Sequence, residues 1–508
     1  MPFFMLTPSR QPGPISLRAL IPSASFVGCA DIAVSAVTEQ SSECTPGCLF
    51  AALPGFRSHG RQHIDHALLG GAAAILTDRP LAHVSLPQCV VPDVRHAYGL
   101  VCHGLYGCPS RKLGVAAVTG TNGKTTVTWL VRSLLESASR PTGVIGTIEY
   151  NDSLQSQPSS LTTPDALTLA RCLAAIQDRR AKFAAVELSS HALKQDRASG
   201  LMVDVAIVTN VTSDHLDYHG STDDYFRSKA RIAELVKRGG LLVLNADDPC
   251  HAVILQHAPA DCRVLTFGCE TDADITARIE TMSSQGTKFR LTHGVEQVDC
   301  WTPLIGKHNV SNCLAAVSAV RHFGLSLDEI ATGLAQFDHV PGRLEQVDCG
   351  QEFQVYVDYA HTEDALKHAI ATVRTVTTGR VIVAFGAGGD RDRTKRPQMA
   401  RAAASADEVI VTSDNPRSED PKQILLEVCA GFQLSECSYT SLLDRRQAIE
   451  HALDIARPGD AVLIAGKGHE KTQQIGAEKI PFDDVAVCRD WIRANLSAQR
   501  TSETLASP

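Results

Sequence analysis

The eight residues TGTNGKTT, Thr119 to Thr126, lie between an apolar run and a helical pattern. The apolar run, Leu113 to Val118, is typical of a short buried strand. Behind the loop, apolar residues recur at the spacing of one face of an amphipathic helix, at Val127, Leu130, Val131, Leu134 and Leu135. A strand, a glycine turn and a helix in this order are the context of a phosphate-binding loop.

Each residue type in this loop suits phosphate binding. Gly120 and Gly123 allow a tight turn that directs backbone N–H groups at phosphate oxygens, and the helix N-terminus adds positive potential. Lys124 would reach the β- and γ-phosphates, and the Thr125 hydroxyl would bind Mg²⁺. The usual pattern has a glycine where this chain has Val118, and a glycine turn that binds nothing is the alternative. The GKT ending and its context favour a nucleotide site.

Length and composition limit the class of protein. A chain of 508 residues exceeds one hydrophobic core and indicates about three domains. The net charge of −8 gives no reason to expect nucleic acid or an anionic membrane as a partner. The sixteen cysteines are scattered, which predicts reduced thiols in a cytoplasmic protein. We see no signal-peptide pattern and no run of about eighteen apolar residues, so no membrane insertion is expected.

From residue 113 onward, apolar runs alternate with helical patterns, which predicts α/β domains with mostly parallel sheets. A first series consists of Val144–Thr147, Ala184–Leu188, Val205–Val211 and Leu241–Leu244. A second series consists of Val355–Tyr359, Val381–Phe385, Val409–Thr412 and Ala461–Ala465. A Pro-Gly turn, His339 to Val347, separates them. We therefore predict three domains, 1–112, 113–338 and 339–508, with ligands beyond the carboxyl ends of the strands.

Two polar side chains lie at strand ends of the sheet that carries the phosphate loop. Glu187 opens ELSSHALKQDR, and His215 lies in TNVTSDHLDYHGS. A carboxylate and an imidazole there can hold a second divalent cation, Mg²⁺ or Mn²⁺. A salt bridge for Glu187 and an ordinary loop position for His215 are the alternatives, and the sequence leaves them open.

Two other clusters suggest ligands less strongly. His59, His63 and His66 lie close to Asp65, but their spacing matches no familiar metal pattern, so solvated positions are favoured. The stretch GAGGDRDRTKRP, residues 386–397, has the wrong glycine spacing for dinucleotide binding. Its basic residues suit an anionic reaction centre better.

Ten motifs occur together in the order seen in Mur ligases: GTNGKTT, TTPD, ELSSHAL, TNVTSDHLDYHGS, NADD, GRLE, VDYAHT, GGDRD, DNPR and GKGHE. The chain resembles this family from about residue 37 to 490. The resemblance implies an N-terminal α/β UDP-binding domain, a central P-loop ATPase domain and a C-terminal Rossmann-like domain. It implies an ATP-dependent, Mg²⁺-requiring amide ligase of peptidoglycan precursor synthesis. The chain looks most like the tripeptide-forming member of the family. This resemblance implies that it adds meso-diaminopimelate to UDP-N-acetylmuramoyl-L-alanyl-D-glutamate through an acyl phosphate.

The resemblance also implies roles for individual residues. Catalytic roles fall on Lys124, Lys229 and His361, and metal binding on Thr125, Glu187 and His215. ATP binding falls on Gly120, Thr121, Asn122, Gly123, Lys124, Thr125, Thr126, Asn309, Asn312 and Arg343. The residues implied to bind the UDP-muramoyl-dipeptide are Ser41, Thr162, Thr163, Ser189, Gln195 and Arg197. Those implied to bind meso-diaminopimelate are Arg391, Asp414, Asn415, Pro416, Arg417, Gly466 and Glu470. Lys229 lies where the family carries a carbamylated lysine, an anion able to bind metal.

The DNPR motif carries the expected choice of amino acid. Meso-diaminopimelate differs from lysine by a carboxylate at the far end of its side chain, and a planar guanidinium pairs both oxygens of a carboxylate. Arg417 would supply that guanidinium, with Asn415 orienting it and Arg391 as a second cation. The Glu470 carboxylate would pair the distal amino group. The alternative is a simple turn with Arg417 in solvent.

Three positions depart from the family pattern. Gln40, Ser41 and Ser42 stand where the family has Asp-Ser-Arg, which leaves open how uridine is held. His308 replaces a phenylalanine and Glu363 a proline. A folylpolyglutamate synthetase and a catalytically idle scaffold are the alternative functions; the first would lack DNPR with GKGHE. We expect a monomer.

Overall fold

The structure is a computed structural model that describes Leu6, Pro8 and residues 13–55, 58–212, 216–433 and 437–506. The chain divides into two compact units. The first unit consists of Met1–Arg278, Leu291–Val298 and Ser311–Gln336. The second unit consists of Ile279–Arg290, Asp299–Val310 and Phe337–Pro508. All sixteen cysteines are free thiols, and no helix among the described residues has the length and apolar character needed to cross a membrane.

A five-stranded sheet of order β2-β7-β6-β5-β4 lies in the N-terminal part of the first unit. Its strands are β2 (Ser25–Val27), β4 (Val37–Thr38), β5 (Leu49–Ala51), β6 (Ala74–Thr77) and β7 (Gln88–Val90). Between β5 and β6 lie the short helices η2 (Gly60–His63) and α2 (Ile64–Leu69). Helix α3 (Val94–Leu105) follows β7, and its apolar face joins the core of this sheet.

An eleven-stranded sheet, of order β11-β10-β9-β12-β8-β13-β14-β15-β16-β17-β18, forms the centre of the chain. Strands β9 to β16 in this order pair in parallel. They are β8 (Gly114–Thr119), β9 (Thr142–Ile145), β12 (Phe183–Glu187), β13 (Val203–Val208), β14 (Val236–Asn245), β15 (Arg263–Gly268) and β16 (Ile275–Ser283). The remaining strands are β10 (Glu149–Asn151), β11 (Ser156–Pro158), β17 (Gly286–His293) and β18 (Glu296–Thr302). The predicted parallel sheet is confirmed, whereas its outer strands had no continuous apolar run to reveal them.

Helices cover the central sheet where the apolar pattern predicts. Helix α4 (Lys124–Ser137) follows the phosphate loop, and its five predicted apolar residues are fully buried. Helix α5 (Ala166–Asp178) contributes apolar side chains to the same buried core as β8, β12 and β13. Other helices of this region are α6 (Ser190–Lys194), α7 (Leu216–His219), α8 (Thr222–Ala230), α9 (His251–Leu255), α10 (Lys307–His322) and α11 (Leu327–Ala335).

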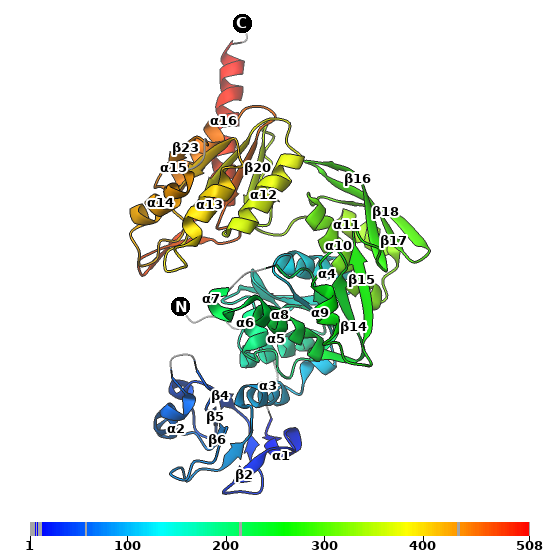
Figure 1. Cartoon of the computed structure of the whole chain (residues 1–508), viewed down its shortest axis with the longest axis vertical. Helices are drawn as coiled ribbons and strands as arrows, with labels where there is room; N and C mark the ends of the chain where they lie inside the picture. Colours follow the sequence, from blue (N-terminus) through cyan, green and yellow to red (C-terminus); the bar gives the residue numbers. More distant parts are fainter. Residues whose placement is uncertain are drawn as a thin grey trace. The chain divides into compact units, whose positions relative to one another are not determined.

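A six-stranded sheet of order β19-β20-β24-β21-β22-β23 forms the core of the second unit. Its strands are β19 (Glu345–Gln346), β20 (Gln354–Asp358), β21 (Val381–Phe385), β22 (Glu408–Val411), β23 (Tyr439–Ser441) and β24 (Ala461–Ala465). Helices α12 (Glu363–Thr375), α13 (Lys395–Ala403) and α14 (Pro421–Cys429) cover one face. Helices α15 (Arg445–Asp454) and α16 (Asp484–Ala506) cover the other (Figure 1).

Several motif residues begin helices. The side chains of Asp165 in TTPD, Ser189 in ELSS and Thr362 in DYAHT each accept a hydrogen bond from the first turn of the helix that follows. Such an N-cap satisfies a backbone N–H that has no partner within the helix. These motifs therefore fix where the chain turns from a strand end into a helix.

A fully buried ion pair joins the two helices on one face of the second unit. The Arg445 guanidinium donates to both carboxylate oxygens of Asp484 at 2.9 and 2.7 Å, and both side chains are 0% exposed. Arg445 also donates to the backbone carbonyl of Ala465 at the end of β24. Removing one partner of such a pair leaves an uncompensated buried charge.

We predict that Asp484→Asn lowers the free energy of unfolding of the second unit by about 3 kcal/mol. Urea denaturation followed by circular dichroism measures this change. Glu450→Gln, in the exposed Arg446–Glu450 pair, is the matched control and should cost less than about 0.5 kcal/mol. Equal stability of both variants would contradict the prediction.

Candidate active site

The phosphate loop follows β8 and requires its two glycines. Gly120 has φ of 152°, and a Cβ there would lie 1.9 Å from the Thr209 hydroxyl oxygen. Gly123 has φ of 85°, and a Cβ there would lie 2.3 Å from the Asn312 side-chain oxygen. Both positions are too close to their neighbours for any side chain, and both lie outside the usual range of non-glycine residues. The loop thus has the shape that its sequence predicted.

Residues at the end of β13 hold the loop in place. The backbone N–H of Thr121 donates to the carbonyl of Asn210 at 2.8 Å. The N–H of Asn122 donates to the side-chain oxygen of Asn210 at 2.9 Å. The hydroxyl of Thr121 lies 3.0 Å from the phenol oxygen of Tyr225. Neither Asn210 nor Tyr225 was among the predicted site residues, although Asn210 stands inside the motif TNVTSDHLDYHGS.

Two lysines converge on one carbonyl oxygen of the loop. Lys124 donates to the carbonyl of Gly120 at 2.8 Å and to that of Thr121 at 3.0 Å. Lys229, from α8, donates to the same Gly120 carbonyl at 2.6 Å, with its side chain 1% exposed and its ammonium over the Tyr225 ring. Two ammonium groups this close repel each other, so an anion placed beside them would be stabilised.

A buried carboxylate links the loop to the neighbouring strands. Glu187 is 0% exposed, and its carboxylate accepts from the hydroxyl of Thr125 at 3.0 Å. It also accepts from the backbone N–H and hydroxyl of Thr147, at 2.9 and 2.8 Å. Among the described residues no basic side chain forms an ion pair with Glu187, which disfavours the salt-bridge alternative there. His215, the second predicted metal ligand, lies outside the described residues.

The residues at this position suit a hard cation. A carboxylate and a hydroxyl oxygen, beside a loop shaped for phosphate, are ligands that Mg²⁺ accepts together with phosphate oxygens and water. Among the described residues no three His, Cys, Asp or Glu side chains are grouped around a common metal position. His63 and His66 are exposed, as expected for solvated side chains, whereas His59 is half-buried.

Five residues expected to hold the UDP-muramoyl-dipeptide form one hydrogen-bonded group. Their contacts are Thr147 with Thr162 at 3.1 Å, Ser189 with Thr163 at 2.9 Å, Arg197 with Thr163 at 3.1 Å and Arg197 with Gln195 at 2.7 Å. Thr163 also donates to the backbone carbonyl of Glu187 at 2.8 Å. The group is therefore continuous with the phosphate loop. Ser41 lies in the N-terminal sheet region, where its hydroxyl is 3.0 Å from the His66 ring.

In the second unit, a buried lysine holds two of the expected amino-acid ligands together. Lys467 is 0% exposed and donates to the side-chain oxygen of Asn415 at 3.2 Å and to Glu470 at 3.0 Å. Asn415 in turn donates to Glu470 at 2.8 Å. Burial alone would raise the pKa of Glu470, but the charge of Lys467 and the hydrogen bond from Asn415 hold the pKa below its ordinary value. Lys467 was not among the predicted site residues, although it is the lysine of GKGHE.

Arg417 is half-buried and hydrogen-bonded rather than lying free in solvent. Its guanidinium donates to the carbonyl of Gly389 at 2.6 Å, and its φ of 52° lies in the left-handed region. Arg391 donates to the carbonyl of Asp390 at 3.0 Å. The expected ligand position Gly466 lies against Asp414: a Cβ on Gly466 would come within 2.6 Å of its carboxylate.

The expected ATP-contacting residues of the second unit gather partly around Tyr359. The Arg343 guanidinium lies 4.8 Å from the centre of the Tyr359 ring, and a ring nitrogen of His361 is 2.8 Å from the Tyr359 carbonyl oxygen. Asn309 lies elsewhere, at the start of α10, where its side chain donates to the carbonyl of Ile305 at 2.8 Å. Burial raises the pKa of Asp358, whose carboxylate accepts from the backbone of the Arg343 turn and of the Tyr359 loop.

A glycine loop on a parallel sheet, with two lysines at its carbonyls and a hydroxyl–carboxylate pair beside it, defines a P-loop nucleotide-binding protein. Two family models match the chain, the Mur ligase middle domain over residues 118–320 and the Mur ligase, glutamate ligase domain over residues 342–468. The chain belongs to the Mur ligase family.

Similar proteins support this assignment along nearly the whole chain. The UDP-N-acetylmuramoyl-L-alanyl-D-glutamate–2,6-diaminopimelate ligase of Geobacillus thermodenitrificans (strain NG80-2) is 43% identical over 469 residues, 91% of this chain and 95% of that one. A solved structure of a ligase with the same name is 32% identical, with a TM-score of 0.69 over 95% of this chain and 99% of that one. The folylpolyglutamate synthase of Mycobacterium tuberculosis, solved with ADP and AMPPCP, shares the fold at 21% identity, with a TM-score of 0.61 over 73% of this chain and 92% of that one.

We predict that Lys124→Ala lowers ATP-dependent phosphate release by more than about 100-fold, because the variant loses a cation at the phosphates. Steady-state phosphate release and the melting temperature are the measurements. Lys112→Ala, at an exposed position before β8, is the control and should keep wild-type rates. A folded Lys124→Ala variant with full activity would refute the assignment of the loop.

Proposed function

We propose that the chain is an ATP-dependent ligase that adds meso-diaminopimelate to UDP-N-acetylmuramoyl-L-alanyl-D-glutamate in peptidoglycan precursor synthesis. The observation that carries the proposal is that Arg391 and Arg417 form no ion pair among the described residues, in a chain that also holds the Lys467–Glu470 pair and is 43% identical to a ligase of that name. The 21% identity to the folylpolyglutamate synthase extends to the fold alone, and this disfavours that alternative.

The proposed reaction has two steps. The γ-carboxylate of the D-glutamate residue attacks the γ-phosphorus of ATP, which forms an acyl phosphate and releases ADP. An amino group of diaminopimelate then attacks the acyl carbon and loses a proton, and phosphate leaves. Catalysis of both steps comes mainly from positioning and charge stabilisation.

Residues of the first unit would bind the phosphates and the UDP-linked substrate. Lys124 would neutralise negative charge on the transferred phosphoryl group, and Thr125 and Glu187 would hold Mg²⁺. Bound Mg²⁺ would polarise the phosphoryl oxygens. The hydrogen-bonded group of Thr162, Thr163, Ser189, Gln195 and Arg197 would orient the muramoyl dipeptide.

Residues of the second unit would select the amino acid and contact ATP. Arg417 and Arg391 would pair the distal carboxylate, and Glu470 the distal amino group. Lysine has no such carboxylate, so its binding would leave the Arg417 charge unpaired at a cost of about 2–5 kcal/mol. Arg343, Asn309 and His361 would contact ATP.

The remaining assignments complete the proposal. The protein would act in the cytoplasm as a monomer on three small-molecule substrates. Its domains would be 1–112, 113–338 and 339–508, each containing one of the three large sheets. The test is phosphate release: it should require the UDP-muramoyl-dipeptide, ATP and meso-diaminopimelate together. Phosphate release that is independent of the amino acid would refute the ligase. The absence of any release would refute it as well and leave the idle scaffold.

Arg417→Ala is expected to reduce the preference for meso-diaminopimelate over L-lysine by about 30-fold or more, because the guanidinium that pairs the distal carboxylate is gone. The measurement is kcat/KM for both amino acids in wild type and variant. Arg401→Ala, exposed on α13, is the control. An unchanged preference in Arg417→Ala would show that Arg417 does not read the carboxylate.

Lys229→Ala is expected to lose turnover that a short carboxylic acid such as propionate partly restores. The acid would take the place of a carbamate on Lys229, whose ammonium otherwise lies beside Lys124 at the Gly120 carbonyl. Phosphate release is measured over a range of acid concentrations. Lys124→Ala, assayed in the same way, should gain nothing. Full activity of Lys229→Ala without added acid would rule out the carbamate role.

A further inference from the structure

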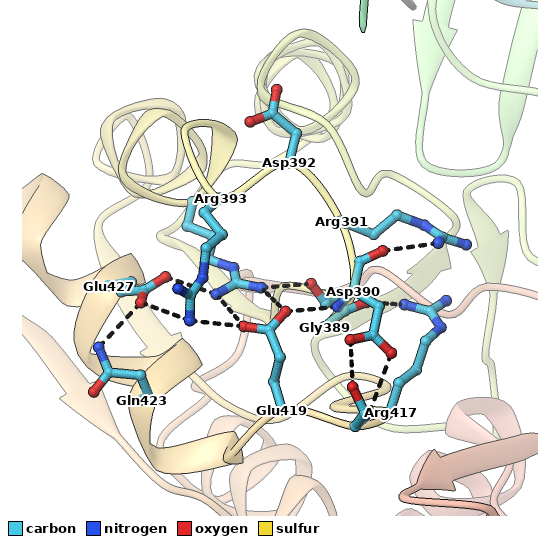
Figure 2. Close-up of polar contacts among 12 residues, drawn as sticks. Gly389, Asp390, Arg391, Asp392, Arg393, Arg417, Glu419, Gln423 and Glu427 are labelled. Carbon is cyan, nitrogen blue, oxygen red and sulfur yellow. Dashed lines mark hydrogen bonds and ion pairs between the residues drawn. The ribbon is translucent and has the colours of Figure 1, made fainter. Parts of the chain in front are cut away.

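Arg391 and Arg417 lie in two loops that follow adjacent parallel strands, β21 and β22. Each guanidinium donates to a backbone carbonyl, that of Asp390 or of Gly389. Within the described part of the chain neither one forms an ion pair with a carboxylate. Figure 2 shows both guanidinium groups extending to the same side of the loops, away from a cluster of charged side chains around Glu419. Hydrogen bonds from Ser418 and, to a smaller extent, the Arg417 charge lower the pKa of Asp390, so part of the Arg417 charge is felt by that carboxylate. Both guanidinium groups still form no ion pair among the described residues, so they can receive an anionic ligand.

Glu419 and its neighbour join the two loops. The carboxylate of Glu419, in the β22 loop, accepts from the backbone N–H of Asp390, in the β21 loop, at 2.6 Å. Ser418 donates its backbone N–H and its hydroxyl to the Asp390 carboxylate at 3.2 and 2.6 Å. The backbones also approach closely, since a Cβ on Gly389 would lie 1.9 Å from the Pro416 carbonyl oxygen. These contacts couple the position of the β21 loop to that of the β22 loop.

Arg396, from α13, holds the Glu419 side chain in place. Its side chain is 2% exposed, and its two terminal nitrogens donate to the two carboxylate oxygens of Glu419 at 3.0 and 2.7 Å. One of these nitrogens also lies 3.3 Å from the Gly388 carbonyl oxygen. The hydrogen bonds from Arg396 are the main cause that lowers the pKa of Glu419 to about 2, which favours its ionised form.

The cluster around Glu419 carries no net charge. Glu427, from α14, accepts from Arg396 at 2.6 Å, and Arg393 lies 3.0 and 3.3 Å from the carboxylates of Glu419 and Glu427 (Figure 2). Two cations and two anions compensate one another, so the cluster adds little potential at the neighbouring guanidinium groups. The cluster therefore affects the Arg391 and Arg417 guanidinium groups mainly by fixing the positions of their loops.

We propose that the Arg396–Glu419 pair is a specificity-determining positioning element that sets the separation of the Arg391 and Arg417 guanidinium groups for one distal carboxylate. This inference rests on the proposed function, because it concerns how that site recognises its amino acid. The pair acts through the two loops and touches no substrate. Binding of a planar carboxylate by two cations requires their positions to be held to within about 0.5 Å.

Glu419→Gln tests the proposal, because glutamine keeps an oxygen for the Asp390 N–H but loses the charge that Arg396 pairs. The KM for meso-diaminopimelate should rise at least about tenfold, and the preference over L-lysine should fall by a similar factor. The KM values for ATP and for the UDP-muramoyl-dipeptide should stay within about twofold of wild type. Glu419→Asp, which keeps the charge but withdraws it by one methylene, should show the same selective loss.

Glu427→Gln is the matched control. It makes the same chemical change at a carboxylate on the same arginine, but Glu427 bonds no backbone atom of either loop among the described residues. All of its KM values should stay within about twofold of wild type. The proposal is overturned if Glu419→Gln leaves the KM for meso-diaminopimelate unchanged, if all three KM values rise equally, or if Glu427→Gln has the same effect.

The amino-acid preference of the wild-type protein distinguishes a failure of this inference from a failure of the proposed function. A wild-type protein that does not use meso-diaminopimelate refutes the proposed function before any variant is made. A wild type that prefers meso-diaminopimelate, together with an unaffected Glu419→Gln variant, refutes the positioning role alone. Melting temperatures of all variants identify any loss that comes from unfolding.

Discussion

The buried carboxylate of Glu187 is the contact on which the site of the first unit depends. It accepts hydrogen bonds from Thr125 at the start of α4 and from Thr147 beyond β9. The sheet order β9-β12-β8 brings these three strand ends side by side. A buried carboxylate without donors costs several kcal/mol, so the phosphate loop and the loop beyond β9 constrain one another. The hydrogen-bonded group that is proposed to hold the muramoyl dipeptide is linked to the same contact, because the Thr147 hydroxyl donates to that of Thr162.

In the second unit a buried cation, the Lys467 ammonium, joins several segments in a comparable way. Lys467 is completely buried and donates to Asn415, Glu470 and the carbonyl of Thr472. These residues belong to segments that follow β22 and β24, so one ammonium group holds both together. Desolvation of the ammonium is offset by three acceptors, one of them charged. In both units a single ionised group therefore orders several loops at the ends of parallel strands.

Local patterns made the phosphate loop and most of the parallel strands predictable, although β15, β16 and β23 were not among the predicted runs. Gly120 and Gly123 are constrained by backbone geometry, and the apolar stripe of α4 is buried in full. The antiparallel strands β10, β11, β17 and β18 were missed because their residues alternate or are polar and form no continuous apolar run.

The partners of the site residues could not be read from the sequence in the same way. Thr147 and Glu187 are 40 residues apart, and Asn415 and Lys467 are 52 apart, so only the folded sheet brings them together. The family resemblance named Glu187, Asn415 and Glu470 but says nothing of which hydrogen bonds hold them. Lys467 lies inside the GKGHE motif, but lysine side chains are mostly exposed, so the burial of Lys467 could not be predicted from the sequence.

The contact between Arg417 and the Gly389 carbonyl has a consequence for how such a protein can evolve. The two residues are 28 positions apart, and the arginine occupies a backbone conformation with φ of 52° that most side chains avoid. Replacement of Arg417 alone removes the donor to the Gly389 carbonyl, while the residue at position 417 still has to adopt a positive φ. Under the proposed function, exchange of one amino-acid substrate for another would thus require changes in both segments, and a replacement in only one of them would be expected to bind either substrate poorly.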